Sequence, residues 1–408
     1  MEMALRPYAF AGVALIGGGV VAALPVGLPI PHLPNVKSEA VQLTASDADI
    51  DSFLTSVVTE FNDASANSTQ LFDNFALAPF VGAQQATVNG FDYLQDLING
   101  TSFDTVLGDI QTNLTNVLSA FPLIDASTTT TTDTTGMTLD ALHSLVFGQL
   151  PSMLPAGTPA AVTEVLDFLA SPASGMLIGT LGPVISPEVA LLNSADAISA
   201  AVQAGDSSTA LQDLLAAPAD VLGSFFNGAT LNLDALVPAV NDSGFLPAGD
   251  SISALSFAFG GLLSPGTVGD TFKAATGSIH AVGGSIFNSL GIDLNVLLGT
   301  TPISLDLAAN PVGPLGAVEG FDELVGILLG DNWNGKGASA GSPLAGLTFP
   351  TLPDTDAAAA SSVNLTDLLG DFSGLNDMGS GLSVEAANSL SSLVDLPHEL
   401  ATGLLSLF

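Results

Sequence analysis

Forty acidic residues but only four basic ones occur in this chain, which gives it a formal net charge of −36. Charged residues nevertheless make up only 11% of the sequence, and 47% of residues are hydrophobic. Disordered acidic chains have the opposite balance, with many charges and few apolar residues. The chain is therefore expected to place a large apolar surface in a core, in an assembly or against lipid.

The charge balance also restricts the partners. Four cations are too few to neutralise a nucleic-acid backbone, so we expect no nucleic acid as a partner, and a polybasic patch for anionic lipid is excluded on the same ground. Nine of the acids are Glu and 31 are Asp, a residue that favours helix N-caps and turns. The sequence has no cysteine, which excludes disulfides, thiol catalysis and zinc–thiolate sites.

The N-terminal 35 residues have the pattern of an export signal. Arg6 precedes the apolar run AFAGVALIGGGVVAALPVGLPIP, which carries no charge and breaks at three prolines. This order of a basic start and an apolar stretch predicts that the chain is exported, to the cell envelope or as a secreted protein. A retained anchor or a buried segment is the alternative interpretation.

Helical spacing of apolar residues dominates the rest of the chain. In residues 40–124, the stripe of Ile50, Phe53, Leu54, Val57, Val58 and Phe61 predicts an N-terminal helical region. Residues 125–136, DASTTTTTDTTG, have no apolar period and are predicted to be a linker. Residues 137–345 form the predicted main helical domain, and residues 346–408 an Asp- and Ser-rich tail with a C-terminal helix.

The predicted fold class is mainly α, with many short helices joined by Gly and Pro loops, and a helical bundle is one arrangement that fits. Ser186 and Pro187, for example, are expected to cap and start one such helix. Alternation of polar and apolar residues is rare and aromatic residues make up 6%, so no β-barrel pattern is evident.

Four charge-free windows reach the length of a membrane span, namely residues 141–163, 168–187, 251–269 and 274–292. Each contains internal glycine, and three contain proline. Buried helices joined by turns are the favoured interpretation, and membrane-embedded segments are the alternative.

The stretch GDNWNGKGASAG, from Gly330 to Gly341, nearly matches two catalytic patterns. A phosphate-binding loop needs Ser or Thr after Lys336, but glycine follows. A nucleophile elbow at Ser339 needs a strand before it and a helix after it, whereas GLTFPTLP follows. The stretch is predicted to be a loop, with Trp333 and Lys336 marking where an apolar helix reaches a protein surface or a membrane interface.

No other constellation of catalytic or metal-binding residues is apparent. The histidines His32, His143, His280 and His398 are scattered, and the Asp47, Asp49, Asp51 series lacks the glycine and the final glutamate of an EF-hand. We therefore predict no enzyme, no catalytic, cofactor-binding or metal-binding residues, and no cofactor.

The block ALLNSADAISAAVQAGDSSTALQDLLAAPADVLGSFFNGATLNLDALVPAV, residues 190–240, carries a resemblance, together with GFLPAG, ISALSFAFGGLLSPGTVG and GSIFNSLGI. Over about residues 137–300 the chain resembles the GjpA-type outer-membrane porin family of mycolic-acid-containing actinobacteria. The resemblance implies a channel for small hydrophilic solutes or cations, and a pore in this chain is expected to form from assembled helices.

Two functions remain open. The first is a pore with Asp side chains along a cation-attracting path, and the second is an exported, non-enzymatic helical protein of the cell wall or surface. Asp side chains should converge on one opening in a channel, and should be scattered at helix caps in a bundle. The expected partners are outer-membrane or cell-wall lipid and further copies of the chain.

Overall fold

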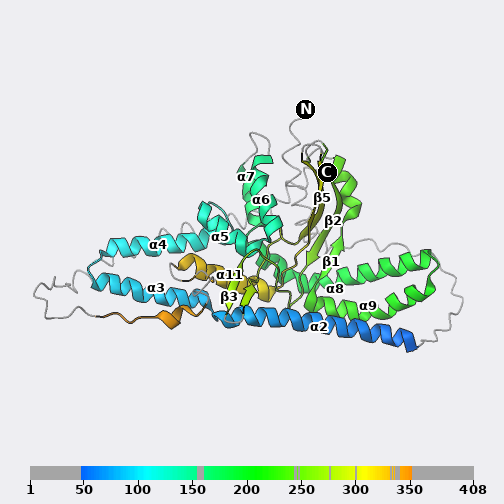
Figure 1. Ribbon diagram of the computed structural model, residues 1–408, viewed down its shortest axis with the longest axis horizontal. Helices are drawn as coiled ribbons and strands as arrows, with labels where there is room; N and C mark the ends of the chain where they lie inside the picture. Colours follow the sequence, from blue (N-terminus) through cyan, green and yellow to red (C-terminus); the bar gives the residue numbers. More distant parts are fainter. Residues whose placement is uncertain are drawn as a thin grey trace, which may run out of the picture.

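The computed structural model describes residues 47–153, 160–242, 246, 249–274, 277–298, 301–330, 333, 335 and 341–351. Figure 1 shows an elongated molecule in which helical arms extend in opposite directions from a central body. One arm contains α2, α8 and α9, and the other contains α3 and α4. A sheet stands on the body beside α6 and α7.

The described chain is mainly α, as predicted. Its helices are α2 (Asp47–Leu77), α3 (Val81–Ile98), α4 (Phe103–Ala120), α5 (Thr128–Thr138), α6 (Ala141–Met153), α7 (Ala160–Leu169), α8 (Pro172–Gln203), α9 (Ser207–Asn227), α10 (Val237–Asp242) and α11 (Pro314–Leu329), with 3₁₀ turns η2 (Asp234–Leu236) and η4 (Pro343–Gly346). The prediction of short helices was wrong for α2 and α8, which run for 31 and 32 residues.

Helix α8 continues through the position where the sequence predicted a new helix. Pro183 and Pro187 lie inside it, so each removes one backbone donor. Ser186 does not cap a helix there; its buried hydroxyl donates to the carbonyl of Phe259 at 3.1 Å. The real cap is Ser171, whose hydroxyl accepts from the backbone N–H of Ser174.

The predicted linker is mostly a helix, α5, in which Thr130, Thr134, Thr135 and Thr138 are buried. The hydroxyl of Thr134 donates to the carbonyl of Thr130 at 2.6 Å, and that of Thr138 donates to Thr134 at 3.0 Å. Because these hydroxyls bond within the helix, it can be buried without an apolar stripe. Ala78, Ala120, Met137 and Leu324 pack in one core cluster, so the N-terminal helices and the main helical region share a core.

A four-stranded antiparallel sheet was missed by the sequence prediction. Its order is β1-β2-β5-β6, from β1 (Ala229–Asn232), β2 (Ser251–Phe259), β5 (Leu290–Leu298) and β6 (Thr301–Leu307); β3 (Thr271–Ala274) and β4 (Gly277–His280) form a separate hairpin. Phe257 of β2 pairs with Leu290 of β5. Phe257, Ala258 and Phe259 are all fully buried, so the end of β2 lacks the polar alternation that would have identified a strand.

The four membrane-length windows thus have different structures. Residues 251–269 and 274–292 include strands and loops, and residues 141–163 and 168–187 contain helical segments. Within the described chain, α8 is the one helix that is long and apolar enough to cross a membrane, and half of its apolar window is buried in this fold.

Trp333 lies in the core cluster of Ala78, Met137 and Leu324 and is only 2% exposed, so the prediction of a surface or interface position was wrong. Its ring centroid is 5.6 Å from that of Phe272, and its indole N–H donates to the carbonyl of Gly341 at 3.0 Å. An internal acceptor thus replaces the water or headgroup that a boundary tryptophan would use. Lys336 and Ser339 lie outside the described residues.

Candidate functional surface on the helical arm

The arm formed by α2, α8 and α9, called the arm from here on, is a single layer of three helices. Helix α9 lies in the middle and packs against α8 on one side and α2 on the other. Helix α8 runs outward from the body, whereas α9 and α2 run back towards it (Figure 1). Globular domains normally bury apolar residues between two packed layers, but no described element packs as a second layer along the outer part of this arm.

Helix α2 has its apolar side chains outside. The less exposed positions of its first two thirds are small or polar, and they recur every three or four residues: Ser56, Glu60, Ala64 and Asn67. The predicted apolar stripe exists, but it faces away from the core, with Phe53 at 36% and Phe61 at 72% exposure. Leu54, Val57 and Val58 between them are also exposed.

Polar contacts join α2 to α9. The side-chain amide of Asn227 donates to the Glu60 carbonyl at 2.8 Å and to the Glu60 carboxylate at 2.7 Å. Asn67 donates to the side-chain oxygen of Asn227 at 3.3 Å. A Cβ atom at Gly223 would collide with the Glu60 carboxylate, so glycine leaves room for this side chain in the seam. The polar seam holds α2 in place while its apolar stripe remains open.

The other two helices extend the apolar surface. With 3.6 residues per turn, the exposed Leu214, Leu222 and Phe225 lie on one side of α9. Exposed Leu191 and Val202 lie on one side of α8, away from Asn193. Because α2 and α9 run in the same direction, the rotation from their shared seam places the α2 stripe on the same broad face as Leu214, Leu222 and Phe225. We call this side of α2, α8 and α9 the apolar face of the arm.

The opposite side of the arm holds an acidic cavity of about 320 Å³. Its polar lining comes from all three helices, and consists of Glu60, Asn193, Ser194, Asp213, Asp220 and Ser224. Asp213 and Asp220 are seven residues apart and therefore lie on one side of α9, opposite its exposed leucines. The arm thus separates an apolar face from an acidic face.

Burial and mutual repulsion affect the carboxyl groups of this cavity. Burial raises the pKa of Glu60; the hydrogen bond from Asn227 lowers it, and repulsion by Asp220 and Asp63 raises it further. Burial and the neighbouring Asp213 raise the pKa of Asp220. Such a cavity attracts cations. Nowhere in the described residues, however, do three or more His, Asp or Glu side chains form a group placed to hold a metal ion.

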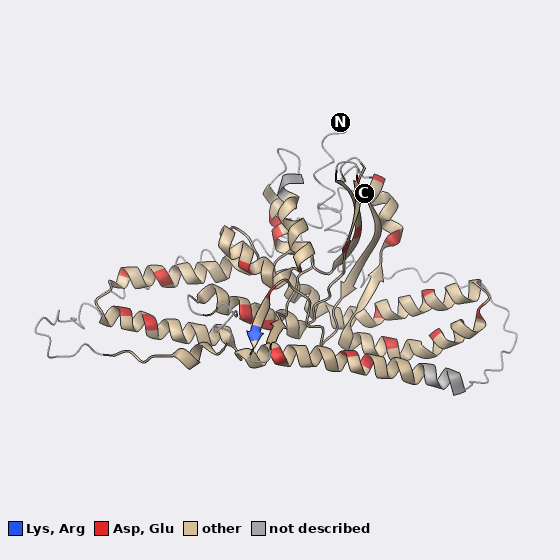
Figure 2. Ribbon diagram, in the orientation of Figure 1, with Lys and Arg blue, Asp and Glu red and all other residues tan. Residues whose placement is uncertain are grey.

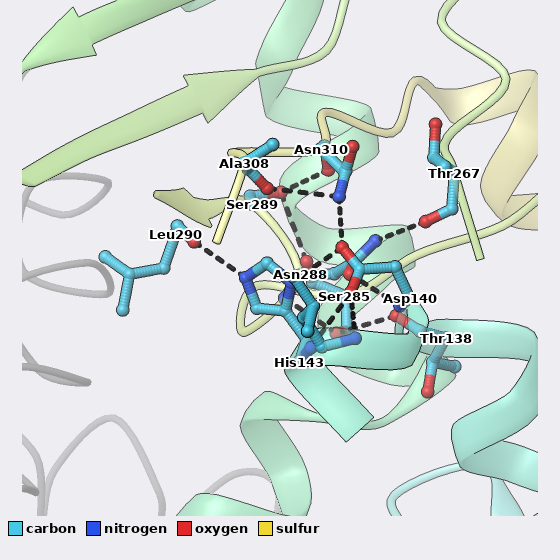
Figure 3. A network of polar contacts seen from close by, with 11 residues as sticks. Thr138, Asp140, His143, Thr267, Ser285, Asn288, Ser289, Leu290, Ala308 and Asn310 are labelled. Atoms are coloured by element: carbon cyan, nitrogen blue, oxygen red, sulfur yellow. Dashed lines mark hydrogen bonds and ion pairs between the residues drawn. The ribbon is translucent and has the colours of Figure 1, made fainter. Parts of the chain in front are cut away.

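The body contains a buried polar network around Asp140 and His143 (Figure 3). Nδ1 of His143 lies 2.8 Å from the carboxylate of Asp140, and Nε2 lies 2.8 Å from the carbonyl of Leu290. Asp140 also accepts the backbone N–H groups of Leu142 and His143, and so it caps α6. Asn310 donates to the same carboxylate at 2.5 Å.

Asn288 connects this network to the loops beneath the sheet. Its side chain accepts from the backbone N–H of Asp140 at 2.9 Å and donates to the carbonyl of Thr267 at 2.8 Å. The buried hydroxyl of Ser285 donates to the carbonyl of Thr138 at 3.1 Å. The hydroxyl of Ser289 donates to the carbonyl of Ser285, also at 3.1 Å. The network therefore ties α6 to residues 285–290 and 310.

The network does not have the geometry of a catalytic triad. His143 is 1% exposed, and both of its ring nitrogens are occupied by Asp140 and Leu290, so neither is free to accept a proton from a nucleophile. Burial alone would raise the pKa of Asp140, but hydrogen bonds from the ring and backbone of His143 and the backbone of Leu142 lower it overall. These residues hold the body together.

The remaining residues singled out from the sequence are not brought together. Helix α2 begins at Asp47, so the Asp47, Asp49, Asp51 series lies in its first turns. His280 is exposed on β4, far in sequence from His143. His32 and His398 lie outside the described residues, as does most of the stretch from Gly330 to Gly341.

Comparisons with protein-family models, with curated proteins and with solved structures found no match.

Proposed function

We propose that the protein is an exported, non-enzymatic helical protein of the cell envelope, and that the apolar face of its arm lies on uncharged lipid. One observation carries the proposal: α2 packs on α9 through Glu60, Asn67 and Asn227 while Phe53, Val57 and Phe61 are exposed. Exposed apolar surface of this extent, rimmed by polar residues, is typical of membrane or protein interaction sites.

Charge selects the kind of lipid. Helices α2, α8 and α9 contain no Lys or Arg, and the whole chain carries −36. Anionic headgroups would repel such a surface, because binding to them normally needs several nearby cations. Two copies of the chain would repel each other through this same net charge. Uncharged lipid gains the apolar contact without either repulsion.

A cation-conducting assembly is the second candidate, and the acidic cavity favours it. Glu60, Asp213 and Asp220 converge on one opening, as carboxylates along a cation path would. Elsewhere, however, Asp140 and Asp206 cap helices, and Figure 2 shows acidic residues spread along both arms. This scatter was the pattern expected of a non-channel helical protein, so the lipid-associated function is the one we favour.

Vesicle flotation tests the proposal. The purified chain without residues 1–35 is mixed with phosphatidylcholine vesicles, or with vesicles containing phosphatidylserine, and centrifuged through a density gradient. We expect flotation with the neutral vesicles and weaker flotation with the anionic ones. A protein that stays at the bottom of the gradient with neutral vesicles contradicts the proposal, and a stable oligomer in that sample indicates that copies of the chain cover the face instead.

Planar-bilayer recording tests the second candidate. Stepwise conductance that reverses near the cation equilibrium potential, and that is reduced in the double variant D213N/D220N, favours the channel. Lipid binding without conductance favours the surface-associated protein.

A further inference from the structure

Helix α11 carries three acidic residues within one and a half turns, and they point into the protein. Burial raises the pKa of Asp322, although this side chain accepts the backbone N–H groups of Gly82 and Val81 at the positive end of the α3 dipole, which lower it in part. Glu319 and Glu323 have no such arrangement. Of the four basic residues only Lys273 is described, and no ion pair to either glutamate is formed by the described residues.

Glu323 is the more deeply buried of the two, with 5% exposure. It receives a hydrogen bond from the backbone of Val282, while its Oε2 atom is buried without a partner. Glu319, one turn earlier, receives a hydrogen bond from the backbone of Phe75 on α2, and its Oε1 atom is likewise buried without a partner. An ionised carboxylate is expensive to bury in this way.

A third unpaired oxygen belongs to Asn74 on α2, which is 2% exposed. Its amide group donates to the carbonyl of His280 at 2.8 Å and to that of Gln70 at 3.1 Å, which leaves Oδ1 unpaired. His280 and Val282 are two residues apart, so Asn74 and Glu323 bind the same short segment. Asn74 also adjoins Phe75, which binds Glu319.

Three buried acceptors, none with a donor among the described residues, therefore lie on the neighbouring segments α2, α11 and the end of β4. An ionised carboxylate only accepts hydrogen bonds, whereas a protonated carboxyl also supplies one O–H donor. Two protonated glutamates would supply two donors, enough to bond the Asn74 oxygen and to bond each other. No ligand is needed to complete such a set.

We propose that Glu319 and Glu323 carry protons in the folded protein, and that their O–H groups form a proton-dependent latch with Asn74 that fastens α2 to α11. The latch is separate from lipid binding, because it holds the C-terminal part of α2 whereas the apolar face uses its N-terminal part. Loss of the protons places two like charges in a buried site, which weakens the attachment of α2 to the body.

The electrostatic surroundings support the proton assignment. Burial, with repulsion by Asp322, raises the pKa of Glu319 to about 8. Burial, with repulsion by Glu319 and Asp322, raises the pKa of Glu323 well above its usual range. Asp73 on α2, Lys273 on β3 and His280 on β4, the ionisable residues nearest in sequence to the contacts of the latch, are exposed.

The pH dependence follows from the direction of these shifts. A carboxyl group whose pKa is raised by folding contributes its full stabilisation when the pH is below its pKa in the unfolded chain, here 4.5. That stabilisation is lost as the pH rises through the pKa of the same group in the folded protein. The latch is therefore closed at acid and neutral pH, and opens as the pH rises through about 8.

Carbon-13 NMR of the glutamate carboxyl carbons tests the latch in the chain used for flotation. The full sequence has nine glutamates, so single substitutions assign the signals. We expect two carboxyls to titrate at about pH 8 or above, one of them absent in E319Q and the other in E323Q. The matched control E188Q replaces an exposed glutamate and should leave both titrations in place.

Unfolding by urea gives a second measurement that does not depend on assignment. The urea concentration at half unfolding of the wild type should decrease as the pH is raised from 6 to 9. E323Q should make this decrease smaller, because a glutamine amide is an uncharged donor at every pH. Glutamates that all titrate in the ordinary carboxyl range overturn the proposal. So does calcium chloride moving both titrations to low pH, because a cation would then satisfy the three oxygens.

Discussion

The body and the arm of this molecule differ in which side chains they bury and which they expose. In the body, Phe257 and Phe259 are fully buried, and the polar network of Asp140, His143 and Asn288 is paired internally. In the arm, Glu60 and Asn227 bond across a helix seam while Phe61 is exposed. The body contains a closed core, whereas the arm is a single layer with apolar side chains exposed on one face.

The contrast shows that apolar content alone does not measure core size. Both regions are rich in apolar residues, yet the arm uses many of them on one open face. Stability should therefore depend on side chains of the body, and attachment to lipid on side chains of the arm. Substitutions of the same residue type in the two regions separate these roles.

The largest expected effect is the loss of a body aromatic. Phe257→Ala should lower the free energy of unfolding by about 3–5 kcal/mol, because it leaves a cavity in the core cluster that Phe257 forms with Phe259 and Leu290. Urea denaturation measures the loss. The paired substitution Phe61→Ala in the arm should change stability by less than about 0.5 kcal/mol. Equal losses from the two substitutions would remove the distinction between body and arm.

A second prediction concerns the polar network of the body. Asn288→Ala should lower the free energy of unfolding by about 1–3 kcal/mol, because the Asp140 N–H and the Thr267 carbonyl lose their partner inside the protein. Asn295→Ala is the matched control, since Asn295 is more accessible and bonds Ser253 at 3.3 Å. The two variants are compared in the same denaturation experiment, and a loss as large in the control would count against the network.

A third, smaller effect depends on acid pH. Hydrogen bonds hold the pKa of Asp140 below its usual 3.8 despite its burial. The ionised side chain therefore stabilises the fold above pH 3.8, and this stabilisation is lost as the pH falls through the pKa that Asp140 has in the folded protein. Asp140→Asn should therefore flatten the stability profile between pH 5 and 2. Asp306→Asn, at an exposed position on β6, should leave the profile unchanged. An unchanged profile in Asp140→Asn would show that the network does not depend on this charge.

The sequence identified the helical class and the apolar stripe of α2, but not the direction in which that stripe faces. Periodicity shows that Phe53, Val57 and Phe61 share a side of the helix, and the usual assumption places such a side in the core. The direction is decided by Gly223, Asn227 and the other residues of α9 that accept the polar side of α2. These lie more than 160 residues away in the chain.

Other features could not be predicted for local reasons. The end of β2 is buried on both sides and has no alternation, and the threonines of α5 satisfy their own hydroxyls, so neither segment carries its usual pattern. His143 looked isolated because its partner Leu290 lies on a strand 147 residues away in the chain. Only the pair Asp140 and His143, three residues apart at a helix start, was visible as a local signal.

The most direct test of the account is flotation of the double variant V58S/F61S with phosphatidylcholine vesicles. Each substitution removes an exposed apolar side chain whose burial in lipid contributes about 1.5–3 kcal/mol, so binding should fall tenfold or more while the urea midpoint stays unchanged. The control Phe349→Ser replaces an equally exposed phenylalanine, at 72%, outside the arm, and should float like the wild type. Undiminished flotation of V58S/F61S would contradict the claim that the apolar face of the arm binds lipid.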